Sequence, residues 1–202
     1  MSKVGVYNEL VKQPGGKYYP DRQWVNVFAG QNPDFQAGGT FKKLVQRIAY
    51  FASAYSASPG MVVNMVDKGA KYPATWREAD DNLLDGSNNY QLHLPSNIPA
   101  LNFWSVTVYY SITASGLKKS QLFPSLNSMD KPAPNPDGSY DIYFGPNAPV
   151  DKQGNWLQTI PGKGHFIPLR LYSPGKAFFD QTWKPDDVKK VGRQEPTRIE
   201  QQ

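Results

Sequence analysis

The sequence contains no cysteine and only two histidines among its 202 residues. The absence of cysteine excludes disulfide frameworks, thiolate zinc sites and cysteine nucleophiles. The two histidines, His93 and His165, do not form a pattern of two histidines and one carboxylate, so we expect no bound metal and no cofactor. The lack of cysteine also leaves the redox compartment undetermined.

Charged residues are scarce as well, at 19% of the chain. The formal net charge is +5, but the positive residues are scattered and the longest runs of lysine are pairs, so we expect no binding to nucleic acid. No apolar run approaches the roughly 20 residues of a membrane-spanning helix, which predicts no membrane span. The amino-terminal residues lack the apolar stretch of a secretory signal, so the cytoplasm is the expected location while the native compartment stays open.

Glycine and proline, by contrast, are frequent, with 17 and 18 residues, and aromatic residues reach 13%. This composition favours many turns over long helices, and the 39% of hydrophobic residues suffice for the core of one globular unit. Short apolar runs separated by turn signals predict a mainly β protein, a jelly-roll-like β-sandwich. The runs are 61–66, 90–94, 103–110, 140–144, 166–172 and 188–191.

The run 103–110 alternates almost strictly between two kinds of side chain. Successive residues of a strand point to opposite faces, so Trp104, Val106, Val108 and Tyr110 share one face, which we expect to be the core face.

One amphipathic helix is predicted near the amino terminus, over residues 40–55. Phe41, Leu44, Ile48 and Phe51 recur there at three- and four-residue steps, whereas lysines and an arginine occupy the other face. The expected organisation is an arm over 1–20, a connector with the helix over 21–60, a β-sandwich over 61–191 and a flexible tail over 192–202.

Candidate site residues gather in the last third of the chain. His165 follows a glycine-rich turn that could present its imidazole to a cavity, and His93 reads instead as an exposed strand histidine. Flat aromatic rings near an arginine would suit a sugar ring or an organic acid, although core packing and turn hydrogen bonds explain the same residues. The candidate ligand-binding residues are Asn155, Trp156, Arg170, Tyr172 and Trp183, and the catalytic candidates are His165 and Asp180.

Several segments, in matching order and spacing, resemble one bacterial family. They are LDGSNNYQLHLP at 84–95, NFWSVTVY at 102–109, NPDGSYDIYFGP at 135–146, NWLQTIPGKG at 155–164, LRLY at 169–172 and FDQTW at 179–183. This pattern is similar to the domain of unknown function 1214 (DUF1214), over roughly residues 19–191. The segment YPDRQW at 19–24 resembles the junction with the family's usual amino-terminal partner domain, DUF1254, which is not present in this sequence.

The resemblance implies a jelly-roll-like β-sandwich, usually part of a longer and often exported protein that forms oligomers, and no established reaction. Two departures are visible: the DKQG at 151–154 replaces the usual sequence before Asn155, and His165 replaces an aromatic residue, often tryptophan. Both put a shared family site around His165 in doubt.

Two classes of function remain open. In the first, the chain is a ligand-binding or oligomer-assembly module, with a small polar ligand, further copies of itself and a separate DUF1254-type domain as partners. In the second it is an enzyme acting on a small carbohydrate or organic acid. There, Arg170 would orient a carboxylate between Trp156 and Trp183, and His165 or Asp180 would handle a proton.

Overall fold

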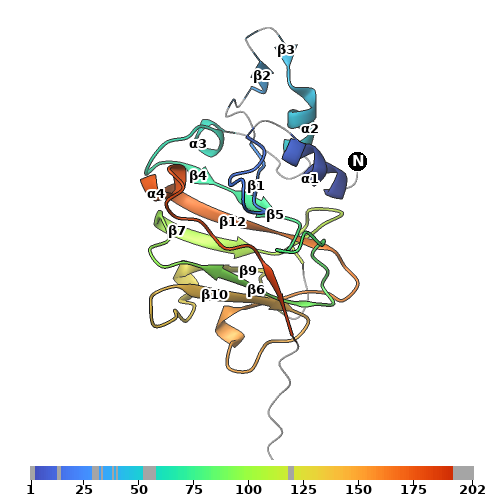
Figure 1. Ribbon diagram of the computed structural model, residues 1–202, viewed down its shortest axis with the longest axis vertical. Coiled ribbons are helices and arrows are strands. Elements are labelled where there is room, and N and C mark those ends of the chain that lie inside the picture. Colours follow the sequence, from blue (N-terminus) through green and yellow to red (C-terminus); the bar gives the residue numbers. More distant parts are fainter. Residues whose placement is uncertain are drawn as a thin grey trace, which may run out of the picture.

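The fold, in a computed structural model, is mainly β, with two sheets and a few short helices (Figure 1). The structure describes residues 3–12, 15–28, 32, 34–37, 39, 41–51, 58–117 and 121–192. The strands are β1 (Val25–Asn26), β2 (Gln36–Ala37), β3 (Phe41–Lys42), β4 (Ala70–Lys71), β5 (Pro73–Thr75), β6 (Asn89–Leu94), β7 (Ala100–Thr107), β8 (Tyr109–Tyr110), β9 (Ser125–Asn127), β10 (Tyr140–Gly145), β11 (Trp156–Gln158), β12 (His165–Pro174) and β13 (Lys189–Val191).

One sheet has seven strands and the other has four. The larger has the order β1-β5-β12-β7-β9, and β4 and β8 also pair with β12; the smaller has the order β11-β10-β6-β13. Strand pairs in both sheets are antiparallel except β10 with β11, which is parallel. The strands β2 and β3 form a separate two-stranded hairpin.

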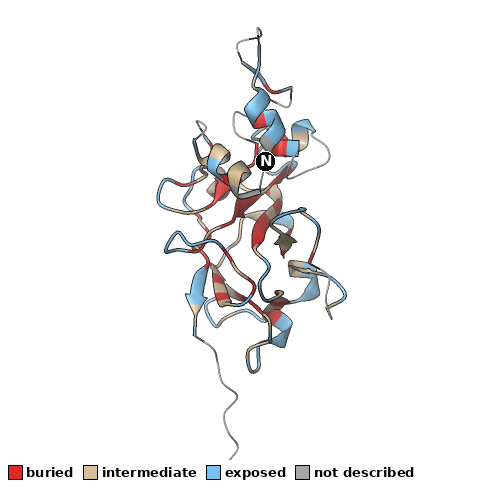
Figure 2. Ribbon diagram, turned by 90° about the vertical axis from the view of Figure 1, so that its right-hand side faces the viewer, coloured by how far each residue is buried: buried red, intermediate tan, exposed pale blue. Residues whose placement is uncertain are grey.

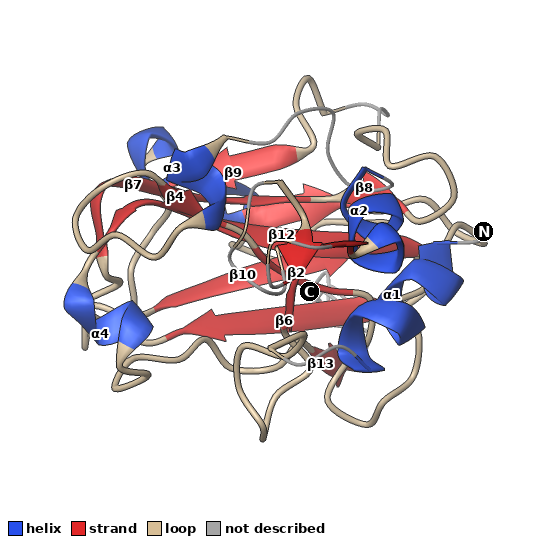
Figure 3. Cartoon of the chain, turned by 90° about the horizontal axis from the view of Figure 1, so that it is seen from above, coloured by secondary structure: helices blue, strands red, loops and turns tan. Residues whose placement is uncertain are grey.

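The helices are short and lie at the periphery of the strands (Figure 3). They are α1 (Lys3–Lys12), α2 (Leu44–Phe51), α3 (Pro59–Val62) and α4 (Lys176–Phe179), together with the 3₁₀ turns η1 (Ser128–Asp130) and η2 (Gln153–Asn155). Within the described part of the chain, every helix is too short or too polar to cross a bilayer. The single helical turn α4 follows the end of β12, and its Phe178 is buried.

The two sheets share one apolar core, to which alternate residues of their strands contribute. Val106 of β7 and Leu171 of β12 meet Leu92 of β6 and Ile142 of β10 there, and all four side chains are fully buried. Burial of apolar surface on this scale is the main stabilising contribution to such a fold. The expected core face of 103–110 is confirmed, because Trp104, Val106 and Val108 are buried in this core and Tyr110 packs against it.

A second apolar cluster lies between the larger sheet and the amino-terminal segments. Trp76 stacks on Phe166 with ring centroids 4.5 Å apart, and Tyr7 of α1 tilts against Trp76 at 5.7 Å. Residues 3–12 of the predicted arm therefore form a helix that packs onto the protein, a feature that the sequence analysis did not anticipate. The domain boundaries proposed from the sequence remain a prediction.

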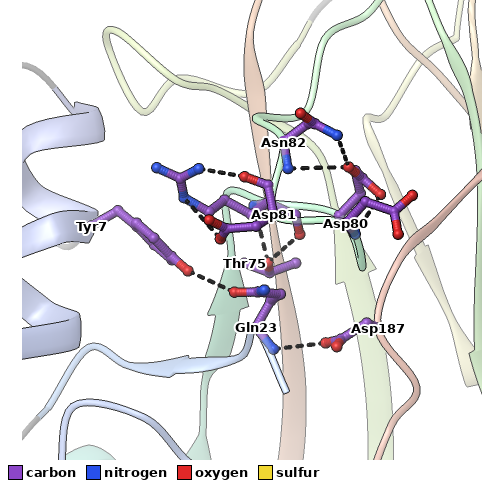
Figure 4. Close-up of polar contacts among 9 residues, drawn as sticks. Tyr7, Gln23, Thr75, Asp80, Asp81, Asn82 and Asp187 are labelled. Atoms are coloured by element: carbon purple, nitrogen blue, oxygen red, sulfur yellow. Dashed lines mark hydrogen bonds and ion pairs between the residues drawn. The ribbon is translucent and has the colours of Figure 1, made fainter. Parts of the chain in front are cut away.

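Polar contacts complete the attachment of α1, as Figure 4 shows. The Tyr7 hydroxyl donates to the Gln23 side chain at 3.1 Å, and the Gln23 backbone N–H donates to the Asp187 carboxylate at 2.8 Å. Burial raises the pKa of Asp187, and the hydrogen bond from Gln23 partly offsets this. The contacts link the two ends of the described chain.

Three further expectations concern residues 40–55, residues 61–66 and the carboxyl-terminal tail. A helix does occur within 40–55, but it covers only Leu44–Phe51. The prediction is wrong for Phe41–Lys42, which form strand β3, and residues 40 and 52–55 lie outside the described residues. The expected strand at 61–66 is wrong, because Pro59 begins the short helix α3, where its fixed φ suits the first helical position. In the expected tail, residues 193–202 likewise lie outside the described residues.

Candidate functional site

The face of the four-stranded sheet that points away from the shared core carries polar and aromatic side chains. In β6, Tyr90, Leu92 and Leu94 are buried, which turns Gln91 and His93 to the other face. The antiparallel register with β10 sets His93 opposite Asp141 and Gln91 opposite Tyr143. Since paired residues of adjacent strands point to the same side, this outer face gathers side chains from segments about 50 residues apart in the chain.

His93 and Asp141 form a close pair on this face. The His93 Nδ1 lies 2.7 Å from the Asp141 Oδ1, and the Asn135 side chain donates to the Asp141 Oδ2 at 3.1 Å. Burial by itself would raise the pKa of Asp141, but hydrogen bonds from His93, Gln91 and Asn135 hold that pKa below its usual value. An ionised carboxylate only accepts hydrogen bonds, so the Nδ1 of His93 must donate; in the neutral form of the imidazole the Nε2 is then the proton acceptor.

This arrangement has a definite chemical capacity. A carboxylate that fixes the tautomer and orientation of an imidazole is the arrangement by which enzymes prepare a general base. Both side chains are partly exposed, at 36% for His93 and 20% for Asp141, so the imidazole can be reached from solvent.

On the same sheet a cleft of about 720 Å³ opens at the end where β6, β10 and β13 meet, and it reaches this face at Tyr143, which follows Asp141 by two residues in β10. A volume of this size is within the usual range for small-molecule sites. Tyr143, Asn88 and Asn89 line the cleft, and Lys190 contributes a cation; the Asn88 amide donates to the Tyr90 hydroxyl at 3.2 Å. The complete lining is Ser87, Asn88, Asn89, Tyr90, Tyr143, Phe144, Pro146, Asn147, Ala148, Pro149, Val150, Lys190, Val191 and Gly192.

A second cavity, of about 90 Å³, shares Tyr143 with the cleft. Asn135, Asp141 and Asn155 contribute to its lining, so it reaches the carboxylate that holds His93. Burial raises the pKa of Tyr143, and the charge of Asp141 adds to that effect, so this phenol remains protonated at neutral pH. Tyr143 therefore connects the cleft to the polar network around Asp141.

Two of the expected ligand-binding residues, Asn155 and Trp156, belong to this region. The buried Asn155 side chain donates to the carbonyls of Ala133 and Asp141 at 2.8 and 3.0 Å, and accepts from the Ala133 N–H at 2.8 Å. Trp156 pairs with Tyr143 across β10 and β11, and its indole N–H donates to the Gly145 carbonyl at 3.1 Å. Both side chains thus hold backbone that forms the walls of the two cavities.

Arg170 and Tyr172 lie on the opposite side of the molecule. They alternate in β12 with Leu169 and Leu171, which are buried in the shared core, so they face away from it on the larger sheet. Arg170 donates to the hydroxyl of Tyr109 at 2.5 Å, and the Tyr172 ring stacks on another aromatic ring at 4.0 Å.

The remaining expected residues are found in three further environments. Trp183 is in the shared core and donates to the Pro95 carbonyl at 3.2 Å. Asp180 follows α4 at the surface, and its hydrogen bonds with Lys176 and Thr182 lower its pKa to about 2. His165 is buried beside Tyr90. The structure therefore does not bring Arg170, Asp180 and His165 together, nor does it pair Arg170 with Asp180.

Sequence reasoning missed the pairing of His93 with Asp141 and the role of Tyr143. Strand alternation did place His93 on the outer face, but no local signal gives the register of β6 against β10. Among the described residues there is no group of three or more histidine, aspartate or glutamate side chains suited to a metal ion.

Comparisons with known proteins agree on a family and leave its activity open. Residues 69–176, more than half of the chain, match a family described as "Protein of unknown function (DUF1214)". No curated protein matches the chain.

Two solved structures are similar to the chain. The VPA0106 protein from Vibrio parahaemolyticus is 21% identical with a TM-score of 0.56, over 73% of this chain and 35% of that one. An uncharacterised protein from Burkholderia cenocepacia is 11% identical with a TM-score of 0.41, over 98% of this chain and 50% of that one. The chain thus spans about a third and a half of their lengths, and the first likeness supports the fold alone. By its sequence match, the chain belongs to the DUF1214 family.

Proposed function

We propose that the protein is a binding module for a small polar ligand, which occupies the cleft beside Tyr143. The observation that carries the proposal is the cleft itself, with about 720 Å³ of space lined by an aromatic ring, amide side chains and a lysine. Amide groups both donate and accept hydrogen bonds, so Asn88 and Asn89 suit hydroxyl groups. Lys190 suits a carboxylate, which makes hydroxylated organic acids and acidic sugars the preferred ligand class.

Asn155 and Trp156 support this site by holding its walls, as their hydrogen bonds to backbone groups indicate. Arg170 and Tyr172 form a separate patch of a cation and aromatic rings on the larger sheet. We keep this patch as a second candidate binding site. Trp183 contributes in this proposal through packing of the shared core.

The test is titration of the protein with simple sugars, sugar acids and small carboxylates, followed by saturation-transfer NMR and thermal denaturation. A ligand that binds only the native state raises the melting temperature. We expect Lys190→Gln to weaken binding of the acidic ligands roughly tenfold, which corresponds to the loss of about 1.4 kcal/mol of binding free energy.

Lys189→Gln is the matched control, because Lys189 is the neighbouring residue in β13 and does not line the cleft. If both variants weaken ligand binding equally, the cause is general surface charge, and the proposed site is contradicted. Absence of binding by every compound in the panel would contradict the proposed function.

The second candidate function is an enzyme acting on such a ligand, and the His93–Asp141 pair is the observation that favours it. In this proposal the general base is His93, held by Asp141, and not His165 or Asp180. Turnover of a bound ligand should then disappear in His93→Gln while binding persists, because the imidazole serves the proton transfer. Turnover that survives this substitution would exclude the assignment.

The third proposal is assembly, with further copies of the chain or a separate DUF1254-type domain as partner. Exposed apolar side chains on α2 support it. A jelly-roll-like arrangement of the strands also remains our proposal for the family fold, supported by two sheets that share a core.

A further inference from the structure

The helix α2 presents its apolar side to solvent. Phe41, just before the helix, and Leu44, Val45, Ile48 and Phe51 within it are between 46% and 66% exposed; these five residues are the α2 face. Leu44, Ile48 and Phe51 recur at three- and four-residue steps and with Val45 form one stripe on the helix, and Phe41 precedes it in β3. The sequence predicted the stripe, but the structure does not bury it against the protein.

The side of α2 opposite to the α2 face attaches the helix to the rest of the protein. Tyr50 is fully buried, with its ring 4.4 Å from the ring of Phe28 and 5.5 Å from that of Phe35. Figure 1 shows α2 and the β2–β3 hairpin standing out from the two sheets, and Figure 2 shows the exposed surface of this projection. A second molecule can therefore reach the α2 face without contacting the sheets.

The charges around α2 are arranged asymmetrically. Lys42 and Lys43 immediately precede the helix, its first turn contains no acidic residue, and its last turn contains no basic residue. Cations near a helix amino terminus are unfavourable and cations near a carboxyl terminus are favourable, because of the helix dipole. An antiparallel neighbour of the same sequence would place the carboxyl-terminal end of its helix, whose last turn contains no basic residue, beside these lysines.

We propose that the α2 face binds the α2 face of a second copy of this chain, with the two helices antiparallel about a two-fold axis near Ile48. This inference rests on the assembly proposal above and names its surface. Antiparallel pairing also keeps the equivalent lysine pairs apart, by about 12 Å along an eight-residue helix. At physiological salt that distance exceeds the screening length of about 8 Å.

The area of the α2 face is consistent with a weak dimer. The five side chains expose on the order of 500 Å² per copy, so a pair of copies would bury about 1,000 Å², the lower limit for specific association. An exposed apolar patch of this size is at the upper end for a monomer and commonly marks an interaction site.

The absence of native cysteine allows a clean cross-linking test. We expect Ile48→Cys to form a disulfide-linked dimer under mild oxidation, because the two copies of residue 48 would face each other across the axis. A mixture of Leu44→Cys and Phe51→Cys should form the mixed dimer in preference to either homodimer, which only an antiparallel arrangement predicts. Leu101→Cys is the control, since Leu101 is 68% exposed on β7.

Light scattering during size-exclusion chromatography over a range of concentrations provides the second measurement. The unmodified chain should dimerise as concentration rises, and Ile48→Glu should remain monomeric with unchanged circular dichroism, while Leu101→Glu should dimerise normally. If the chain is monomeric throughout, this inference and the self-assembly half of the assembly proposal both fail, and only assembly with a DUF1254-type domain is left. If Ile48→Glu still dimerises, assembly stands and the α2 face is not its surface.

Two other results would assign the α2 face to another occupant and overturn the inference. One is a monomer that binds vesicles rich in anionic lipid and loses this binding in Ile48→Glu. The other is a monomer that binds a purified DUF1254-type domain through the same residue.

Discussion

His165 lies edge-on against Tyr90, with ring centroids 5.9 Å apart and an interplanar angle of 71°. The imidazole is buried, and neither of its nitrogens has a hydrogen-bond partner of ordinary geometry among the described residues. Burial lowers the pKa of His165 to about 4, against smaller opposing effects of the Asp85 carboxylate and the Lys163 backbone. The folded protein therefore holds a neutral imidazole in its interior.

This relationship predicts a loss of stability in mild acid. The unfolded state takes up a proton near pH 6.5 and the folded state only near pH 4, so the free energy of unfolding falls as the pH is lowered between those values. The contribution is on the order of 3 kcal/mol. Chemical denaturation at several pH values should show a steeper decline for the unmodified protein than for His165→Leu.

The substitution should leave stability at pH 7 unchanged or increase it, because it removes a buried polar group without partners. His93→Gln is the control, and it should keep the decline between pH 6.5 and pH 4. An identical pH profile for His165→Leu and the unmodified protein would show that His165 is not the titrating group.

Gly86 is predicted to be intolerant of any side chain. A Cβ there would lie 2.1 Å from the backbone oxygen of Ile160, whereas a Cβ at Gly154 would meet nothing within 4 Å. Gly86→Ala should therefore destabilise the protein by at least about 1 to 3 kcal/mol through overpacking. Gly154→Ala is the control and should change stability by no more than about 0.5 kcal/mol. Thermal denaturation measures both variants, and an equal loss of stability in the two would contradict the close approach of Gly86 to Ile160.

Much of the fold could be predicted because strands carry their own signals. The alternation of 103–110 located both β7 and its buried face, since burial of one face requires a period of two. The helix α1 was missed because its ten residues have only a weak apolar periodicity, and packing of Tyr7 against Trp76 stabilises it. Local patterns therefore identify elements with strong periodicity, and tertiary contacts decide the others.

The candidate site could be predicted only in part, for a related reason. Asn155 and Trp156 were candidate ligand-binding residues in the sequence, but their contacts are to backbone that the sequence cannot locate. His93 and Asp141 are paired solely by strand register. The candidates Arg170, Asp180 and His165 are close in sequence, yet alternation and the turn after β12 place Arg170 on the outer face of the larger sheet, Asp180 at the surface and His165 in the interior.

Asn155 should prove essential for stability. Its buried side chain makes three hydrogen bonds to backbone groups of Ala133 and Asp141, so Asn155→Ala leaves several polar groups unpaired. We expect a loss of about 2 to 4 kcal/mol in the free energy of unfolding. The exposed Asn147 lines the cleft, and Asn147→Ala should change stability by no more than about 0.5 kcal/mol. Loss of ligand binding without loss of stability in Asn155→Ala would instead place this residue in direct contact with the ligand.

The tautomer of His93 gives the sharpest prediction about the candidate site. Asp141 is ionised at neutral pH and accepts from His93, so the hydrogen of the neutral imidazole must reside on Nδ1. Nitrogen-15 NMR should report this tautomer, and the assignment is simple because His165 is the only other histidine. In Asp141→Ala the constraint disappears, and we expect the two tautomers to exchange.

Asp151→Asn is the matched control for this measurement. Asp151 lines the same small cavity as Asp141, and the structure pairs it with no histidine. The variant should therefore keep the Nδ1–H form of His93. The contrary result is a hydrogen on Nε2 of His93 in the unmodified protein. Nε2 could then only donate, so Asp141 would not hold the ring as a base. The enzyme proposal would lose the observation that favours it.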